Sequence, residues 1–185
     1  MKLGYLMLVL IGVLCSGCGK KSSFPPSSEW TRFTSPDAPY SLLMPGKPVR
    51  EEQPTDEGGV VILQGCQLDA NQGVIAASMK LPPEWDIKDK MEVKHLLDES
   101  TKKYAEGING IIQEQQDVIV DSKYPGQEST LKVPLSKTTS VTMHVLFVIV
   151  PKYRIQVAVI SENSESSNPL IKECIASLKI NSAKK

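Results

Sequence analysis

The cysteines are the side chains of this sequence best suited to chemistry, because a thiolate can be acylated, oxidised or bound to a metal. The sequence contains Cys15, Cys18, Cys66 and Cys174. The first two follow an apolar run, Leu6–Leu14, which itself follows a basic start at Lys2. A basic start, a short apolar segment and small residues before a cysteine are typical of a secretory signal peptide. The spacing therefore predicts that the chain is processed close to Cys18.

Cys18 directly follows Ser16 and Gly17, and this segment resembles the lipobox of bacterial lipoproteins. The resemblance implies that residues 1–17 are a signal peptide and that Cys18 becomes a diacylglyceryl, amide-acylated N-terminus. Cys15 occupies the position where lipoboxes usually carry leucine, valine or isoleucine. Cleavage by an ordinary signal peptidase and retention as an N-terminal helix therefore stay open as alternatives. The apolar run is shorter than the roughly 20 residues of an ordinary membrane span.

Residues 18–29 are predicted to be the lipid anchor and a flexible tether. Serines and the pair Pro25-Pro26 favour an extended spacer over a packed element. At about 3.3 Å per residue the tether reaches at most roughly 35 Å, so the domain behind it would lie close to the membrane. Gly19-Lys20 lacks the aspartate associated with inner-membrane retention in some bacteria. We expect a cell-envelope location facing outside the cytoplasm, at the outer rather than the inner membrane.

Cys66 and Cys174 would remain after processing, and two interpretations of them are open. An oxidising compartment permits a disulfide between them. Both also lie on predicted apolar faces, where free cysteine is commonly buried as a small apolar residue. A disulfide needs the two Cα atoms within about 7 Å, which a sequence cannot show. Two cysteines alone offer too few ligands for a metal site, so we expect no metal.

The other ionisable side chains form no recognisable catalytic motif. His95 is predicted to be exposed on a helix and His144 to lie in a strand. Four acidic residues occur near one predicted strand pair: Glu114, Asp117, Asp121 and Glu128. Carboxylates across a cleft could do acid–base chemistry, although alternating solvent-facing positions explain them more simply. No nucleophile elbow, Walker loop, zinc-protease or dinucleotide motif occurs. The sequence therefore predicts no catalytic residue and no cofactor.

Length and charge predict one ordinary domain. The chain has 185 residues, and 168 would follow residues 1–17, which is enough for one domain with its own hydrophobic core. That cleavage removes a single charge, Lys2, and leaves a net charge of −1. Nucleic-acid binding needs a clustered positive face, which this balance does not indicate. We expect a domain over residues 30–180, a tail over 181–185, and no nucleic-acid partner.

Hydrophobic periodicity predicts strands interrupted by two helices. Strands are expected over residues 30–34, 40–44, 60–68, 74–79, 111–120, 126–133, 141–150 and 153–160, with a polar loop over 50–59. The long helix is expected to have Asp86 as its N-cap, Gly107 as its terminator and Val93, Leu97, Ser100, Tyr104 and Ile108 on its buried face. A short C-terminal helix is expected to begin at Asn168-Pro169. Antiparallel hairpins with segregated helices predict an α+β fold.

Several segments between residues 30 and 180 carry a resemblance to a known fold family. They are Trp30–Phe33, Ser35-Pro36, Tyr40-Ser41, Met44–Pro48, Tyr124–Glu128, Tyr153–Val157 and Cys174–Lys179. In this order they are similar to small bacterial lipoproteins and secreted proteins with a PsbP-like fold, also called the Mog/PsbP fold. The resemblance implies a central antiparallel sheet of about six or seven strands, flanked by a long middle helix and a short C-terminal helix. Gln127 departs from the pattern, which usually has arginine there.

This resemblance implies little about activity, because one fold can host many functions. We expect a lipid-anchored extracytoplasmic binding or accessory module whose partner is another envelope protein. The turns around Lys47, Tyr124 and Gly126 are candidate contact loops, since rigid exposed loops often carry function; a purely structural role for these turns is the simpler interpretation. An envelope hydrolase with an unrecognised site and a purely structural envelope lipoprotein are the alternatives.

Overall fold

The computed structural model describes residues 26–55, 59–69, 71–82, 89–161 and 169–181. Residues 1–17, Cys18, most of the tether and the end of the tail lie outside them. The described elements are η2 (Ser27–Glu29), β1 (Thr31–Thr34), β2 (Tyr40–Met44), β3 (Val49–Pro54), β4 (Val60–Asp69), β5 (Gln72–Lys80), α2 (Lys90–Gly107), β6 (Ile111–Val120), β7 (Tyr124–Pro134), β8 (Ser140–Val150), β9 (Tyr153–Ser161), α3 (Pro169–Ala176) and β10 (Lys179–Ile180).

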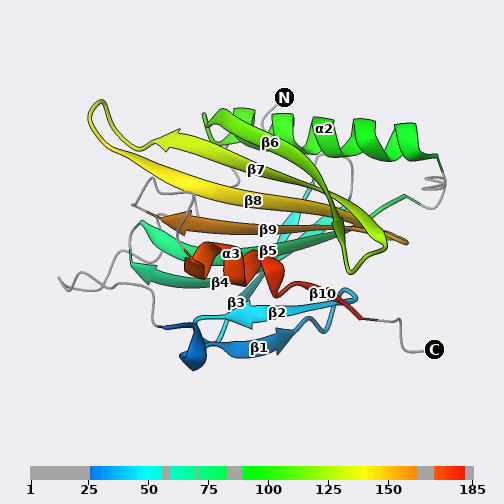
Figure 1. Ribbon diagram of the computed structural model, residues 1–185, viewed down its shortest axis with the longest axis horizontal. Coiled ribbons are helices and arrows are strands. Elements are labelled where there is room, and N and C mark those ends of the chain that lie inside the picture. Colours follow the sequence, from blue (N-terminus) through cyan, green and yellow to red (C-terminus); the bar gives the residue numbers. More distant parts are fainter. Residues whose placement is uncertain (1–25, 56–58, 70, 83–88, 162–168, 182–185) are drawn as a thin grey trace.

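These elements form three layers, as Figure 1 shows. The central sheet has seven antiparallel strands in the order β3-β4-β5-β9-β8-β7-β6. Helix α2 packs on one face of it, over β6, β7 and β8. On the other face lie α3 and a three-stranded sheet in the order β1-β2-β10. The predicted α+β class, with its long middle helix and short C-terminal helix, is confirmed.

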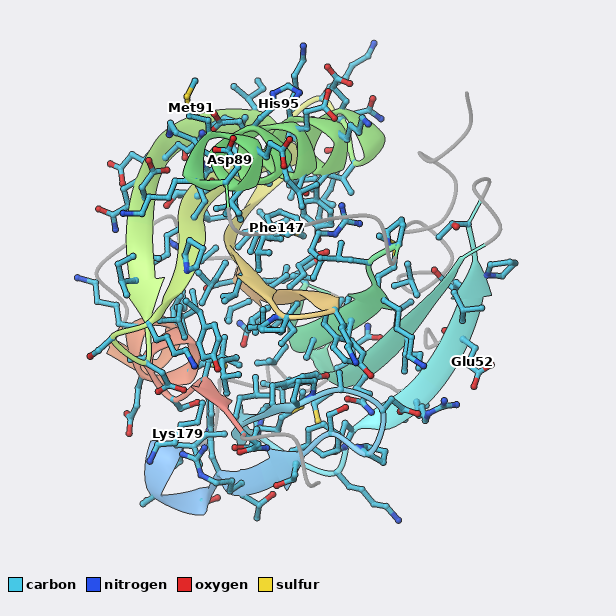
Figure 2. All side chains as sticks on the ribbon, turned by 90° about the vertical axis from the view of Figure 1, so that its right-hand side faces the viewer. Glu52, Asp89, Met91, His95, Phe147 and Lys179 are labelled. Carbon is cyan, nitrogen blue, oxygen red and sulfur yellow. The ribbon has the colours of Figure 1, made fainter. Side chains whose placement is uncertain are left out.

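Strand β8 separates the two main hydrophobic cores. Leu146, Val148 and Val150 belong to the core on the α3 side, whereas Phe147 and Ile149 belong to the core under α2. Figure 2 shows Phe147 between the sheet and α2. Because successive side chains of a strand point to opposite faces, a strand covered on both faces is apolar at every position. The unbroken apolar run Leu146–Val150 thus reflects burial on both faces of β8.

Helix α2 starts and ends at residues different from those predicted. Asp86 lies outside the described residues, and the N-cap is Asp89, whose carboxylate accepts a hydrogen bond from Met91 N at 2.7 Å. Gly107 is the last helical residue and does not terminate the helix. Asn109 does so, with φ 54°, and the next amide, Gly110 N, donates to Ala105 O at 2.8 Å. Asparagine suits this position because it tolerates the left-handed conformation better than most residues.

Two strands were missed by the sequence analysis. The loop predicted over residues 50–59 is wrong for its first half, because β3 pairs along its whole length with β4. The charged residues and Pro54 of β3 do not fit the sequence pattern of a buried strand, but an edge strand tolerates both. Arg50 there bonds Asp37 and Glu52 at 2.9 and 2.6 Å. Strand β10 has only two residues and pairs with the distant β2, so no local pattern predicts it.

The hairpin between β6 and β7 is tighter than predicted. Its turn consists of Asp121, Ser122 and Lys123, and the first two have φ values of 49° and 55°. Gly126 therefore belongs to strand β7, where it is buried between Val118 of β6 and Val148 of β8. A Cβ atom at Gly126 would lie 2.8 Å from Phe147 O. Only glycine fits this close approach of neighbouring strands.

Candidate functional site

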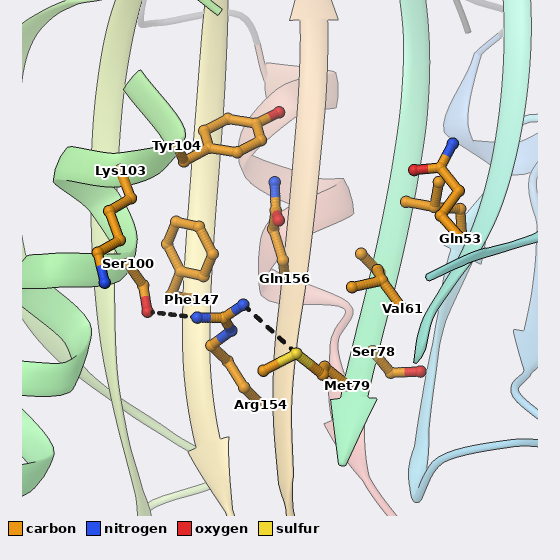
Figure 3. Close-up of a pocket in the computed structure, with 12 residues that line it drawn as sticks. Gln53, Val61, Ser78, Met79, Ser100, Lys103, Tyr104, Phe147, Arg154 and Gln156 are labelled. Atoms are coloured by element: carbon orange, nitrogen blue, oxygen red, sulfur yellow. Dashed lines mark hydrogen bonds between the residues drawn. The ribbon is translucent and has the colours of Figure 1, made fainter. Parts of the chain in front are cut away.

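A pocket of about 140 Å³ lies on the α2 side of the central sheet, as Figure 3 shows. Strands β3, β4, β5, β8 and β9 and helix α2 all contribute residues to its wall. Its apolar part consists of Val61, Leu63, Ala77, Met79 and Phe147. A cavity of about 150 Å³ holds one benzene molecule, whereas small-molecule sites usually measure roughly 300–1,000 Å³. The pocket therefore has the size of a single large side chain.

Two cations lie in the wall of this pocket. Arg154 of β9 donates from Nη1 to Ser100 Oγ at 3.0 Å and contacts Met79 Sδ through Nη2 at 3.9 Å. Lys103 Nζ donates to Glu99 Oε2 at 3.2 Å on the exposed surface of α2. Such an exposed ion pair contributes little to the stability of the fold. The lining of the pocket contains the basic side chains of Arg154 and Lys103 and, among the described residues, no carboxylate, while Glu99 pairs with Lys103 at the surface. A negatively charged group in the pocket would therefore meet positive charge in the wall.

Gln156 supplies a further donor to the pocket. Its Nε2 atom is buried and has no hydrogen-bond partner among the described residues. Tyr104, across the pocket, donates to Met143 Sδ at 3.1 Å. Burial raises the pKa of Tyr104, and the neighbouring Gln156 side chain offsets this only in part. The Gln156 amide therefore lies beside the Tyr104 hydroxyl, and an acceptor atom entering the pocket would meet its Nε2 donor.

No local pattern in the sequence predicts this pocket. In the sequence, Arg154 and Gln156 alternate with Ile155 and Val157, a pattern typical of a half-buried strand with its polar side in solvent. The structure instead directs Arg154 and Gln156 toward the α2 layer, where they line the pocket. One sequence signal pointed to these residues. Polar and apolar residues alternate in β9, although β9 directly follows β8, whose second half is entirely apolar. The partners from β3, β4 and β5 come together only through long-range strand pairing.

The two histidines occupy different environments. His95 lies on the outer surface of α2, with its side chain 77% exposed, as Figure 2 also shows. His144 is buried in β8, with Nδ1 3.3 Å from Thr130 Oγ1 and with no partner for Nε2 among the described residues. Burial lowers the pKa of His144. The carboxylates of Glu114 and Glu128 oppose this effect, and Lys172 of α3 adds to it.

This burial predicts a measurable pH dependence of stability. The unfolded chain binds a proton at His144 near pH 6.5, whereas the folded chain resists protonation until a lower pH. Stability should therefore be unaffected by His144 above that pH and fall as the pH drops below it. Urea unfolding at pH 7.5, 6.5 and 5.5 should show a smaller acid loss in His144→Gln than in wild type. His95→Gln is the surface control, and equal acid loss in wild type and His144→Gln would refute the prediction.

The four acidic residues do not converge on a cleft. Asp117 Oδ2 accepts from Lys94 Nζ at 2.6 Å, and its Oδ1 accepts from Gln127 Nε2 at 3.1 Å. These two bonds, the one to Lys94 above all, lower the pKa of Asp117. Asp121 accepts from the Ile180 amide, and Glu128 accepts from Gln116. Within the described ranges, no group of three or more His, Cys, Asp or Glu side chains could hold a metal ion.

Cys66 and Cys174 are buried free thiols in this structure. Cys66 Sγ donates to Gly46 O at 3.2 Å, and Cys174 Sγ lies 3.6 Å from Leu43 O, so both thiols lie near the end of β2. Burial raises the pKa of Cys66 to about 11 and, together with the charge of Cys66, that of Cys174 to about 12. Such thiols are poor nucleophiles at neutral pH. A disulfide between them stays a prediction.

The three candidate contact residues differ in their exposure. Lys47 is exposed in the turn between β2 and β3. Tyr124 is half-buried against the α3-side core, with Lys123 Nζ 5.1 Å from the centre of its ring. Gly126 is buried within the sheet. The structure shows how exposed these residues are, and their role in binding a partner stays a prediction.

No protein-family model and no curated protein sequence matches this chain. Among solved structures, the solution structure of cyanobacterial PsbP (CyanoP) from Synechocystis sp. PCC 6803 is similar, with a TM-score of 0.59 and 10% sequence identity. The match covers 90% of this chain and 98% of that one. This chain has a PsbP-like fold. The fold expected from the resemblance is thus confirmed, and at this identity the similarity concerns the fold alone.

A second solved structure, from Bacteroides thetaiotaomicron VPI-5482, has a TM-score of 0.48 and 14% identity. That match covers 83% of this chain and 49% of the other. Within the described segments of the PsbP-like domain, no helix has the length and apolar character needed to cross a membrane.

Proposed function

We propose that this protein is a lipid-anchored, extracytoplasmic binding or accessory module that acts through contact with another envelope protein. The observation that carries the proposal is the pocket beside α2, which has the size of one side chain and a positively charged wall. The N-terminal segment ending at Cys18 supports the location at the membrane.

The pocket suits one anchoring side chain of a partner. Binding energy at protein interfaces concentrates in a few side chains that fill well-packed pockets. Here an apolar stem would contact Val61, Ala77 and Phe147, and a carboxylate head would reach Arg154 and Lys103. A glutamate of the partner combines such a stem with such a head. The proposed partner therefore presents an acidic side chain to the pocket.

The described chemistry favours binding over hydrolysis. A nucleophile needs a lowered pKa or an adjacent general base. Burial instead raises the pKa values of Tyr104, Cys66 and Cys174. Ser100 Oγ accepts a hydrogen bond from the guanidinium of Arg154, which does not activate it as a base would.

Site-specific photo-crosslinking in living cells tests the proposal. A photoreactive residue in place of Lys103 should crosslink one envelope protein, whereas the same residue in place of the exposed Lys137 should not. Ala77→Leu fills the pocket and should reduce the Lys103 crosslink at least about fivefold, which corresponds to roughly 1 kcal/mol of binding. Absence of a crosslink at Lys103, or an equal yield in Ala77→Leu, would contradict the proposal.

A further inference from the structure

Strand β6 is an open edge of the central sheet. It comes last in the strand order and, among the described residues, pairs only with β7. Figure 1 shows it at the margin of the sheet, beneath α2. Eight of its ten residues are exposed, seven of them in an unbroken run from Ile111 to Asp117. Its outer backbone N–H and C=O groups are therefore accessible for pairing with another strand.

The opposite edge of the same sheet is protected against such pairing. Strand β3 has six residues, carries Arg50, Glu51 and Glu52, and ends in Pro54. Charged side chains, shortness and proline are the means by which proteins block strand edges. Strand β6 has ten residues and contains no lysine, arginine or proline. Ile111 and Ile119, near its two ends, are 64% and 65% exposed.

The centre of β6 is acidic. It carries Glu114 and Asp117, and its neighbours Glu128 on β7 and Asp98 on α2 add two more carboxylates. Lys94 contacts two of these carboxylates, at 2.6 Å from Asp117 and 3.9 Å from Asp98. Lys132 lies opposite Ile111, at the end of the strand. Asp117 and Asp98 thus face Lys94 on the α2 side of the sheet, whereas Glu114 and Glu128 lie on the α3 side, near His144, with Lys172 as the neighbouring cation. On both sides carboxylates outnumber the cation beside them.

This charge pattern argues against a second copy of the chain as the occupant. Symmetric antiparallel self-pairing of β6 centred on Glu114, or on Asp117, would place that carboxylate directly opposite its own copy. Like charges directly opposite each other destabilise a strand pair. A partner strand with lysine or arginine at its centre would instead form stabilising opposite-charge pairs with Glu114 and Asp117.

We propose that β6 is a docking edge for an extended segment of another protein, with basic residues at its centre and apolar residues at its ends. The segment adds an eighth strand to the seven-stranded sheet. Backbone hydrogen bonds provide the affinity, and the alternating side chains provide the specificity. This surface involves none of the residues that line the pocket beside α2, so it does not depend on the function proposed for that pocket.

Hydrogen exchange measured by mass spectrometry tests the docking edge on protein purified from cells in neutral detergent. The probe is a ten-residue peptide with valine and isoleucine at both ends, threonines between, and two lysines at its centre. Its twin has glutamates in place of the lysines. The lysine peptide should slow exchange in residues 111–120 and leave residues 49–54 unchanged. Its affinity should exceed that of the glutamate peptide about tenfold, as expected for two or three opposite-charge pairs.

Charge reversal supplies the matched variants. Glu114→Lys should remove the preference for the lysine peptide, whereas Glu52→Lys on β3 should retain it. No protection of residues 111–120, equal affinity for both peptides, or an unchanged preference in Glu114→Lys would overturn the inference. Protection of the same residues that appears without peptide as protein concentration rises would also overturn it, since that result indicates self-pairing. None of these results bears on the crosslink at Lys103, which tests the proposed function separately.

Discussion

Cys18→Ala should abolish labelling of the protein by a palmitate analogue and release it from the membrane fraction. The proposed anchor is attached through the Cys18 sulfur atom, and alanine offers no atom that could replace it. Each buried methylene of an acyl chain contributes about 0.8 kcal/mol, so losing two or three chains removes essentially all membrane affinity. Metabolic labelling followed by membrane fractionation measures both effects in the same cells.

Cys15→Leu is the matched control for this experiment. It changes the neighbouring cysteine and restores the residue type usual at that lipobox position, so labelling should persist. Labelling that survives in Cys18→Ala, or that disappears in Cys15→Leu, would refute the assignment of Cys18 as the acylated residue.

Gly126→Ala should destabilise the fold by about 2–3 kcal/mol, within the range of overpacking in a close-packed interior. The added Cβ would lie 2.8 Å from Phe147 O and 3.3 Å from side-chain carbons of Leu146 and Val118. The first contact is with backbone of β8, which is held by pairing on both sides. Neither strand can give way without disturbing the other. Urea unfolding, read from the shift of the midpoint, measures the loss.

Gly46→Ala is the comparison for Gly126→Ala. A Cβ at Gly46 meets no atom within 4 Å, and the residue lies in a turn outside the sheets. Its stability should stay within about 0.5 kcal/mol of wild type. Equal midpoint shifts in the two variants would show that the packing around Gly126 is not as tight as described.

The fold was predictable where the pattern is local. The boundaries of β2 and β6 match the sequence prediction, because turn residues flank both strands. Strand β3 was not predicted because its charged residues are typical of an edge strand, whereas hydrophobic periodicity detects only strands with a buried apolar face. The end of α2 was misplaced because Gly107 is the usual type of terminator, whereas the left-handed position falls at Asn109.

The candidate site was not predictable in the same way. Gln127 attracts attention in the sequence only as a departure from a family pattern. In the structure it is fully buried, donates to Asp98 and Asp117, and accepts from Thr101. Helix α2 supplies two of these partners and strand β6 the third. The pocket depends likewise on six elements brought together by strand order, and strand order is not encoded in any local period.

The mass of the intact protein isolated from the membranes of its native cells tests the central claim most directly. We predict a chain that begins at Cys18 and carries a diacylglyceryl group and an amide-linked acyl chain on that residue. A chain that still begins at Met1, has no fatty adduct and is recovered from the cytosol would contradict this account.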